Sequence, residues 1–92
     1  MTDLETRIIG TEKLLLARVT ELGATMTGDQ RISEEVAALL LGTTGPALKQ
    51  ARHEGRAPKA YALGAGCRSR VSYRISELAR YIEESFENFY PT

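Results

Sequence analysis

Side chains that could catalyse a reaction are scarce in this chain of 92 residues. It has one histidine, His53, and one cysteine, Cys67. The metalloprotease motif HExxH and the redox or zinc motif CxxC are both absent. Residues 64–66 (Gly-Ala-Gly) lack the third glycine and the following helix of a dinucleotide-binding loop. The sequence therefore predicts no catalytic residue, no cofactor and no metal site, and it argues against an enzyme.

The candidate functional side chains in this sequence are basic, and they are concentrated in one region. Residues 43–74 contain seven Lys or Arg and a single acid, Glu54, which gives a net charge of +6. Residues 1–42 contain four bases and seven acids, and residues 75–92 contain one base and four acids, so each flank carries −3. The total charge of zero hides this segregation. One strongly basic region is suited to contact phosphate, so the charge distribution favours a nucleic acid as partner.

Two short helices joined by a tight turn are expected at the start of the basic region. The first helix begins after the capping residue Ser33 and ends at Gly42, because glycine accepts the left-handed conformation at a helix end. The second begins after Thr44, has Pro46 in its first turn and continues to about His53. Two helices connected in this way match the helix-turn-helix motif.

A β-hairpin and a final helix are expected next. Residues 61–63 and 70–74 alternate like two strands around the turn signal Gly-Ala-Gly. The last helix would begin at the capping residue Ser76 and continue to about Asn88, with an apolar stripe that closes the core.

Residues 1–30 add one helix and a linker. Thr11 can cap a helix over about residues 11–22, and Gly10 would separate it from a loose N-terminal segment. Its apolar face (Leu15, Val19 and Leu22) either enlarges the core, which we favour, or docks a partner. The expected fold is mainly α with a small β-hairpin wing: a winged helix-turn-helix over residues 31–90 with an extra N-terminal helix.

The order of residues in the basic region resembles that of excisionase and MerR-like DNA-binding domains. The resemblance is carried by residues 33–40, 42–48, 52–58 and 71–78 (SEEVAALL, GTTGPAL, RHEGRAP and VSYRISEL). It covers roughly half of the chain, residues 32–82, and the order of several short matches carries it. At residues 45–47 (Gly-Pro-Ala) the chain departs from the family, which often has polar or basic residues there. Phage excisionases, recombination directionality factors and small AlpA-type regulators share this pattern.

The resemblance implies an accessory protein that binds repeated DNA sites near an attachment site, often head to tail, and bends the DNA. The bend would promote excision of a mobile element by a tyrosine recombinase, an integrase. The implied partners are therefore double-stranded DNA, further copies of the chain, and the recombinase.

The second helix of the motif would enter the major groove, with Leu48 facing the core. Gln50 is the best candidate for a base contact, because its amide can bond adenine N6 and N7 together, and Lys49 could reach guanine or phosphate. Arg68 and Arg70 in the wing would meet the minor groove, where arginine responds to groove width. The predicted DNA contacts are Thr43, Thr44, Lys49, Gln50, Arg52, His53, Arg56, Arg68, Ser69 and Arg70.

Two alternatives remain open. The same residues would serve a small AlpA-like or MerR-like transcriptional regulator. A protein-interaction module, with the N-terminal helix and residues 86–90 as binding surfaces, belongs to another class, and the charge of +6 in the middle third argues against it. Acids within residues 1–5, and no apolar run longer than residues 36–41, predict a cytoplasmic protein without a membrane partner. The resemblance implies that the source is bacterial or phage.

Overall fold

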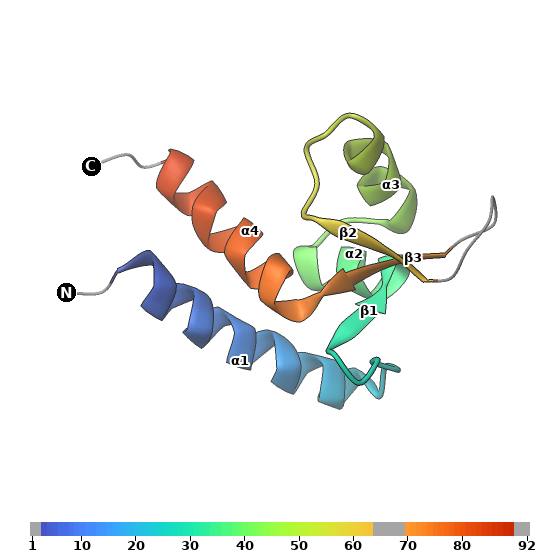
Figure 1. Cartoon of the computed structure of the whole chain (residues 1–92), viewed down its shortest axis with the longest axis horizontal. Helices are drawn as coiled ribbons and strands as arrows, with labels where there is room; N and C mark the ends of the chain where they lie inside the picture. The colour runs from blue at the N-terminus through green and yellow to red at the C-terminus, as the bar shows by residue number, and fades with distance from the viewer. Residues whose placement is uncertain (1–2, 64–69, 90–92) are drawn as a thin grey trace.

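Four helices and one small antiparallel sheet make up the parts of the chain that the structure describes, residues 3–63 and 70–89 (Figure 1). The structure is a computed structural model. The elements are α1 (Leu4–Leu22), β1 (Arg31–Ser33), α2 (Glu34–Leu41), α3 (Gly45–His53), β2 (Ala60–Leu63), β3 (Arg70–Arg74) and α4 (Ile75–Phe89). The expectation of a mainly helical fold with a small sheet is confirmed. No helix in the described ranges is long and apolar enough to cross a membrane.

Helix α1 is longer than the sequence predicted. It begins at Leu4, because the Asp3 carboxylate accepts a hydrogen bond at 2.9 Å from the backbone N–H three residues later. The expectations that residues 1–10 are loose and that Gly10 breaks the helix are therefore wrong. A glycine inside a helix costs about 1 kcal/mol relative to alanine, and burial of Ile8, which is 5% exposed, offsets that cost.

Helices α1 and α4 lie side by side in opposite directions, which brings the two ends of the described chain together (Figure 1). The inner face of α1 (Ile8, Leu15 and Val19) is buried in the same core as Leu78 of α4. Leu22, expected on that face, is 38% exposed because it lies at the end of the helix. The expectation that the N-terminal helix enlarges the core is confirmed.

Polar contacts reinforce the pairing of α1 with α4. Arg7 of α1 donates from Nε to Glu83 at 3.0 Å, and Thr11 donates to the same carboxylate at 2.7 Å. Arg80 of α4 forms two hydrogen bonds of 3.1 Å with Glu5 of α1. Several acids of the two flanking segments are therefore paired with bases inside the molecule.

The sheet has the order β1-β3-β2, and both outer strands pair antiparallel with β3. The predicted pairing of residues 61–63 with residues 70–74 is confirmed by the β2–β3 register, in which Ala60 lies opposite Tyr73. The sequence did not predict β1, because three residues show no readable alternation and pairing with β3 fixes the strand. Helix α4 follows β3 directly, one residue before the expected cap Ser76.

Two adjacent leucines of α1 test its place in the core. Leu15 is 8% exposed and Leu14 is 71% exposed. We expect Leu15→Ala to lower the free energy of unfolding by about 2–5 kcal/mol because it leaves a cavity, and Leu14→Ala to change it by less than about 0.5 kcal/mol. Denaturant unfolding followed by circular dichroism measures both values. Equal changes in the free energy of unfolding in the two variants would contradict the burial of Leu15 of α1 in the core.

Candidate nucleic-acid interface

Local capping fixes the α2–turn–α3 unit. The Ser33 hydroxyl accepts a hydrogen bond of 3.2 Å from the backbone N–H of Val36 at the start of α2. Gly42 ends that helix with φ of 78°, in the left-handed region that glycine adopts without strain. The Thr44 hydroxyl then accepts from the backbone N–H of Ala47 at 3.2 Å and starts α3. The predicted ends of both helices are confirmed.

Helix α3 packs one apolar residue into the core, and its other face is exposed to solvent. Leu48 is 4% exposed and belongs to the core, as expected. The exposed residues of α3 and its cap include Thr44, Lys49, Gln50 and His53. The residues predicted to contact DNA from this helix therefore lie on a surface that a duplex could reach.

A polar cluster of Glu34, Arg52 and Tyr73 joins α2, α3 and β3. Arg52 donates from Nε to one Glu34 oxygen at 2.9 Å and from Nη2 to the other at 3.3 Å. The hydroxyl of Tyr73, a residue with no exposed surface, donates to the same carboxylate at 2.7 Å. A bidentate arginine–carboxylate pair fixes direction as well as distance. The cluster therefore sets the angle of α3 against α2 and the sheet.

The pKa values in this cluster show that the charged form of Glu34 is favoured. Partial burial acts to raise the pKa of Glu34, but the hydrogen bonds from Arg52 and Tyr73 outweigh it, and the pKa lies below its ordinary value. Burial, together with the hydrogen bond to Glu34, raises the pKa of Tyr73 to about 12. Glu34 is thus ionised and Tyr73 is a neutral donor near neutral pH.

This pairing bears on Arg52, which the sequence predicted as a phosphate contact. Its side chain is 24% exposed and its guanidinium is directed to Glu34. In the free protein Arg52 therefore positions α3, and its contact with phosphate stays a prediction.

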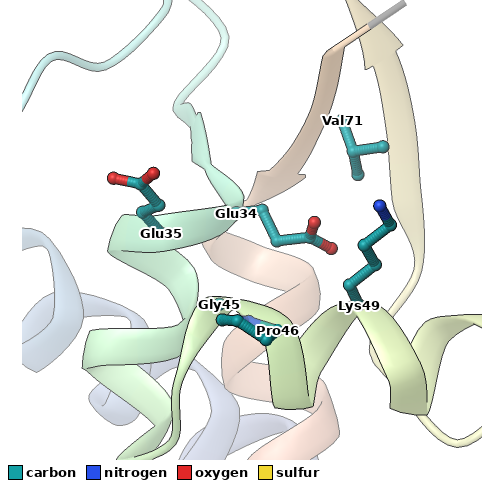
Figure 2. A pocket seen from close by; sticks show the side chains of 6 residues that line it. All are labelled: Glu34, Glu35, Gly45, Pro46, Lys49 and Val71. Carbon is teal, nitrogen blue, oxygen red and sulfur yellow. The ribbon is translucent and has the colours of Figure 1, made fainter.

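A hollow of about 690 Å³ lies between the starts of α2 and α3 and the strand β3. Figure 2 shows the carboxylate of Glu34 and the amine of Lys49 on the same side of the hollow, whereas the Glu35 carboxylate points away from them. Gly45 and Val71 add small or apolar surface. A phosphate inside this hollow would meet the Glu34 carboxylate beside Lys49, so the hollow itself is poorly suited to an anion.

A second polar cluster lies where α3 ends. Gln50 donates from Nε2 to Glu54 at 2.7 Å, and Arg56 donates from Nε to the same carboxylate at 2.9 Å. These hydrogen bonds, that of Gln50 first, hold the pKa of Glu54 below its ordinary value. From the sequence, Glu54 was notable only as the single acid of residues 43–74. Its spacing of four residues from Gln50 is the signal that could have placed it beside that amide.

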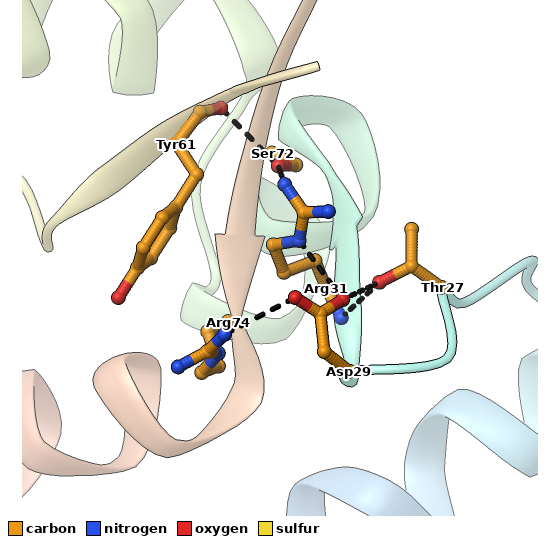
Figure 3. Close-up of polar contacts among 6 residues, drawn as sticks. All are labelled: Thr27, Asp29, Arg31, Tyr61, Ser72 and Arg74. Atoms are coloured by element: carbon orange, nitrogen blue, oxygen red, sulfur yellow. Dashed lines mark hydrogen bonds and ion pairs between the residues drawn. The ribbon is translucent and has the colours of Figure 1, made fainter. Parts of the chain in front are cut away.

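Two arginines of the sheet are also paired. Asp29 accepts from Arg31 at 3.0 Å and from Arg74 at 3.1 Å, which ties β1 to β3 (Figure 3). Hydrogen bonds from Thr27 and Arg31 hold the pKa of Asp29 well below its usual range. The Arg74 guanidinium lies 5.2 Å from the centre of the Tyr61 ring, so this ring packs against a charged side chain of the neighbouring strand.

The remaining predicted contacts fall into two groups. Thr43 and Arg56 are exposed beside the two ends of α3. Arg68 and Ser69 lie outside the described residues, as does the side chain of Arg70 at the start of β3. The structure thus gathers seven of the predicted contacts on or beside α3, namely Thr43, Thr44, Lys49, Gln50, Arg52, His53 and Arg56.

Comparison with known proteins adds no assignment. No protein-family model, no curated protein and no solved structure matches the chain. Conclusions about function therefore depend on the geometry and charge of the residues themselves.

Glu34→Gln tests the cluster that positions α3. It removes a charged hydrogen-bond acceptor, so we expect the free energy of unfolding near neutral pH to fall by about 1.5–3 kcal/mol. Glu35→Gln is the matched control, because Glu35 is exposed and acts only on the helix dipole, which is worth about 1 kcal/mol at most. Urea unfolding of both variants and the parent measures the difference.

The effect of Glu34→Gln should depend on pH. The pKa of Glu34 is lower in the folded chain, so its ionisation stabilises the fold above its unfolded pKa of about 4.3 and stops doing so as the pH falls through the folded pKa. The difference in the free energy of unfolding between the parent and Glu34→Gln should therefore become smaller below about pH 4. A difference that does not change with pH would contradict the role assigned to the Glu34 carboxylate.

Proposed function

We propose that the protein is a small DNA-binding protein of the winged helix-turn-helix type. In this proposal α3 lies in the major groove and the β2–β3 hairpin reaches the neighbouring minor groove. The observation that carries it is the open face of α3, on which Thr44, Lys49, Gln50 and His53 are exposed. Leu48 and the Glu34–Arg52 pair hold that helix against the core and α2.

Each exposed residue has a distinct role in this proposal. Gln50 reads a base edge, with adenine as the preferred base, because an amide offers one acceptor and one donor side by side. Lys49 and Thr44 bind phosphate and fix the register of the helix on the duplex. Residues 45–47 (Gly-Pro-Ala) offer no polar side chain. Direct reading is therefore limited to a few bases, and the shape of the DNA supplies the remaining specificity.

The distribution of charge supports the same orientation. The net charge of +6 over residues 43–74 includes α3 and the hairpin, and residues 75–92, which contain most of α4, carry −3. Arg52 and Arg74 are paired with Glu34 and Asp29, so the attraction to DNA in this proposal comes from the other bases of residues 43–74. Neighbouring copies on one duplex can also attract each other head to tail.

Within this class, we propose the role of an excisionase, or recombination directionality factor. The protein would bind repeated sites near an attachment site and bend the DNA, so that a tyrosine recombinase excises a mobile element. The support is the resemblance of the residue order over residues 32–82. A single module of this size buries only about 600–1,000 Å² on DNA, so cooperative neighbours would be needed for tight binding.

A protein-interaction module is the second candidate. It is favoured by apolar side chains that are open to solvent, notably Leu14 of α1 at 71% and Leu39 of α2 at 59%. Such a module would use these apolar side chains, and not the basic residues, as its contact surface.

Binding to duplex DNA across a series of salt concentrations tests the proposal. We expect the affinity to fall steeply with salt, because binding to phosphate releases counterions. Lys49→Ala should reduce the slope of the log–log plot by about one, and Arg68→Ala/Arg70→Ala by about two, because about one counterion fewer is displaced for each cation removed from the interface. Lys13→Ala, an exposed base on α1, is the matched control and should leave the slope unchanged.

The outcomes separate the candidates. Cooperative binding to attachment-region duplexes, together with stimulation of excision by the recombinase, would support the excisionase role. Binding to a promoter without an effect on excision would favour an AlpA-like regulator. The absence of binding to every duplex at low salt would exclude both DNA roles and leave the interaction module.

A further inference from the structure

Glu54 is the one acidic residue among residues 43–74, and it lies against two of the predicted DNA contacts. Its Oε2 accepts from the Gln50 amide at 2.7 Å, and its Oε1 accepts from Arg56 at 2.9 Å. Helix α3 ends at this residue, and all three side chains are on the exposed surface. An acid beside the surface that would meet phosphate repels the phosphate and so weakens binding to every DNA sequence. The position of Glu54 therefore indicates a role other than increasing affinity.

The contact with Glu54 fixes which way the Gln50 amide faces. An ionised carboxylate can only accept hydrogen bonds, so the amide nitrogen must point to it. A half-turn of the amide would place Oε1 against the carboxylate and replace an attraction by a repulsion. The low pKa of Glu54 keeps the carboxylate ionised near neutral pH. The carbonyl Oε1 and the second N–H of Gln50 are then available to a base edge in a fixed order.

We propose that Glu54 determines the base specificity of α3 by positioning the Gln50 amide to pair with adenine. This inference rests on the proposed DNA-binding function. Adenine presents an N6 donor beside an N7 acceptor in the major groove, and the fixed amide matches them with its carbonyl and its N–H. Glu54 is a positioning residue in this scheme, because it acts through Gln50 and makes no contact with the base.

In this proposal the pairing of Glu54 with Arg56 also increases specificity. While its guanidinium is paired with Glu54, it is less available to phosphates of any sequence. Glu54 thus lowers the affinity for all duplexes, and it increases the difference in affinity between the preferred duplex and the others. Specificity is a difference of affinities, and a local repulsive charge is one physical means to increase it.

Selection from a randomised duplex pool compares the parent with Glu54→Gln. The new glutamine keeps the shape but can donate as well as accept, so it no longer fixes the Gln50 amide. We expect the parent to select adenine at one position, and Glu54→Gln to reduce that preference by about fivefold while binding all duplexes more tightly. Glu21→Gln is the matched control: it removes an exposed acid that is paired with Arg18 on α1, and it should keep the preference of the parent.

A second pair of variants separates positioning from a structural effect. In a Gln50→Ala background, Glu54→Gln should still raise the overall affinity but should not change the base preference. The thermal unfolding midpoint of Glu54→Gln should equal that of the parent, because the contact is exposed. A change in base preference that persists without Gln50 would overturn the inference.

The outcomes distinguish this inference from the proposed function. An unchanged preference in Glu54→Gln, or a parent that binds duplexes without any base preference, would overturn the role of Glu54 and leave DNA binding intact. A parent that binds no duplex would overturn both.

Discussion

The ionised carboxylate of Glu34 is the point on which the proposed interface depends. It joins α2 to Arg52, which is 18 residues away in α3, and to Tyr73, which is 39 residues away in β3. Leu48 is the only buried residue of α3, so apolar packing alone gives that helix one attachment to the core. The bidentate Arg52–Glu34 pair also fixes the orientation of α3, which a single leucine contact cannot do. The open face of α3 is thereby turned to solvent at a defined angle.

Charge in this protein has two separate uses. Arg31 and Arg74 are paired with Asp29 and hold the sheet together, as Arg52 holds α3. Lys49 is exposed on α3 and also lines the hollow beside Glu34; in the proposed function its amine contacts phosphate. The helices α1 and α4 carry acids that are partly neutralised by Arg7 and Arg80, and α1 packs on the side of α4 that faces away from α3 (Figure 1).

Features coded by neighbouring residues could be predicted from the sequence, and features that depend on distant partners could not. The ends of α2 and α3 were predicted because Ser33, Gly42 and Thr44 act on their own backbone surroundings. The strand β1 was missed because pairing with β3 creates it. The start of α1 was missed because Gly10 suggests a break, whereas Asp3 caps the helix and burial of Ile8 in the core carries it through the glycine. In the candidate site, the exposed face of α3 followed from helical spacing. The structural use of Arg52 did not, because its partner belongs to another helix.

The most direct test is an NMR titration of the isotope-labelled protein with duplex DNA. The central claim is that the face of α3, fixed by Glu34, meets the DNA, while α1 and α4 stay outside the contact. The predicted result is that the largest amide shift changes fall within residues 43–56 and that those of α1 are unaffected. Changes centred on α1 and α4, or no changes at saturating duplex, would contradict the claim.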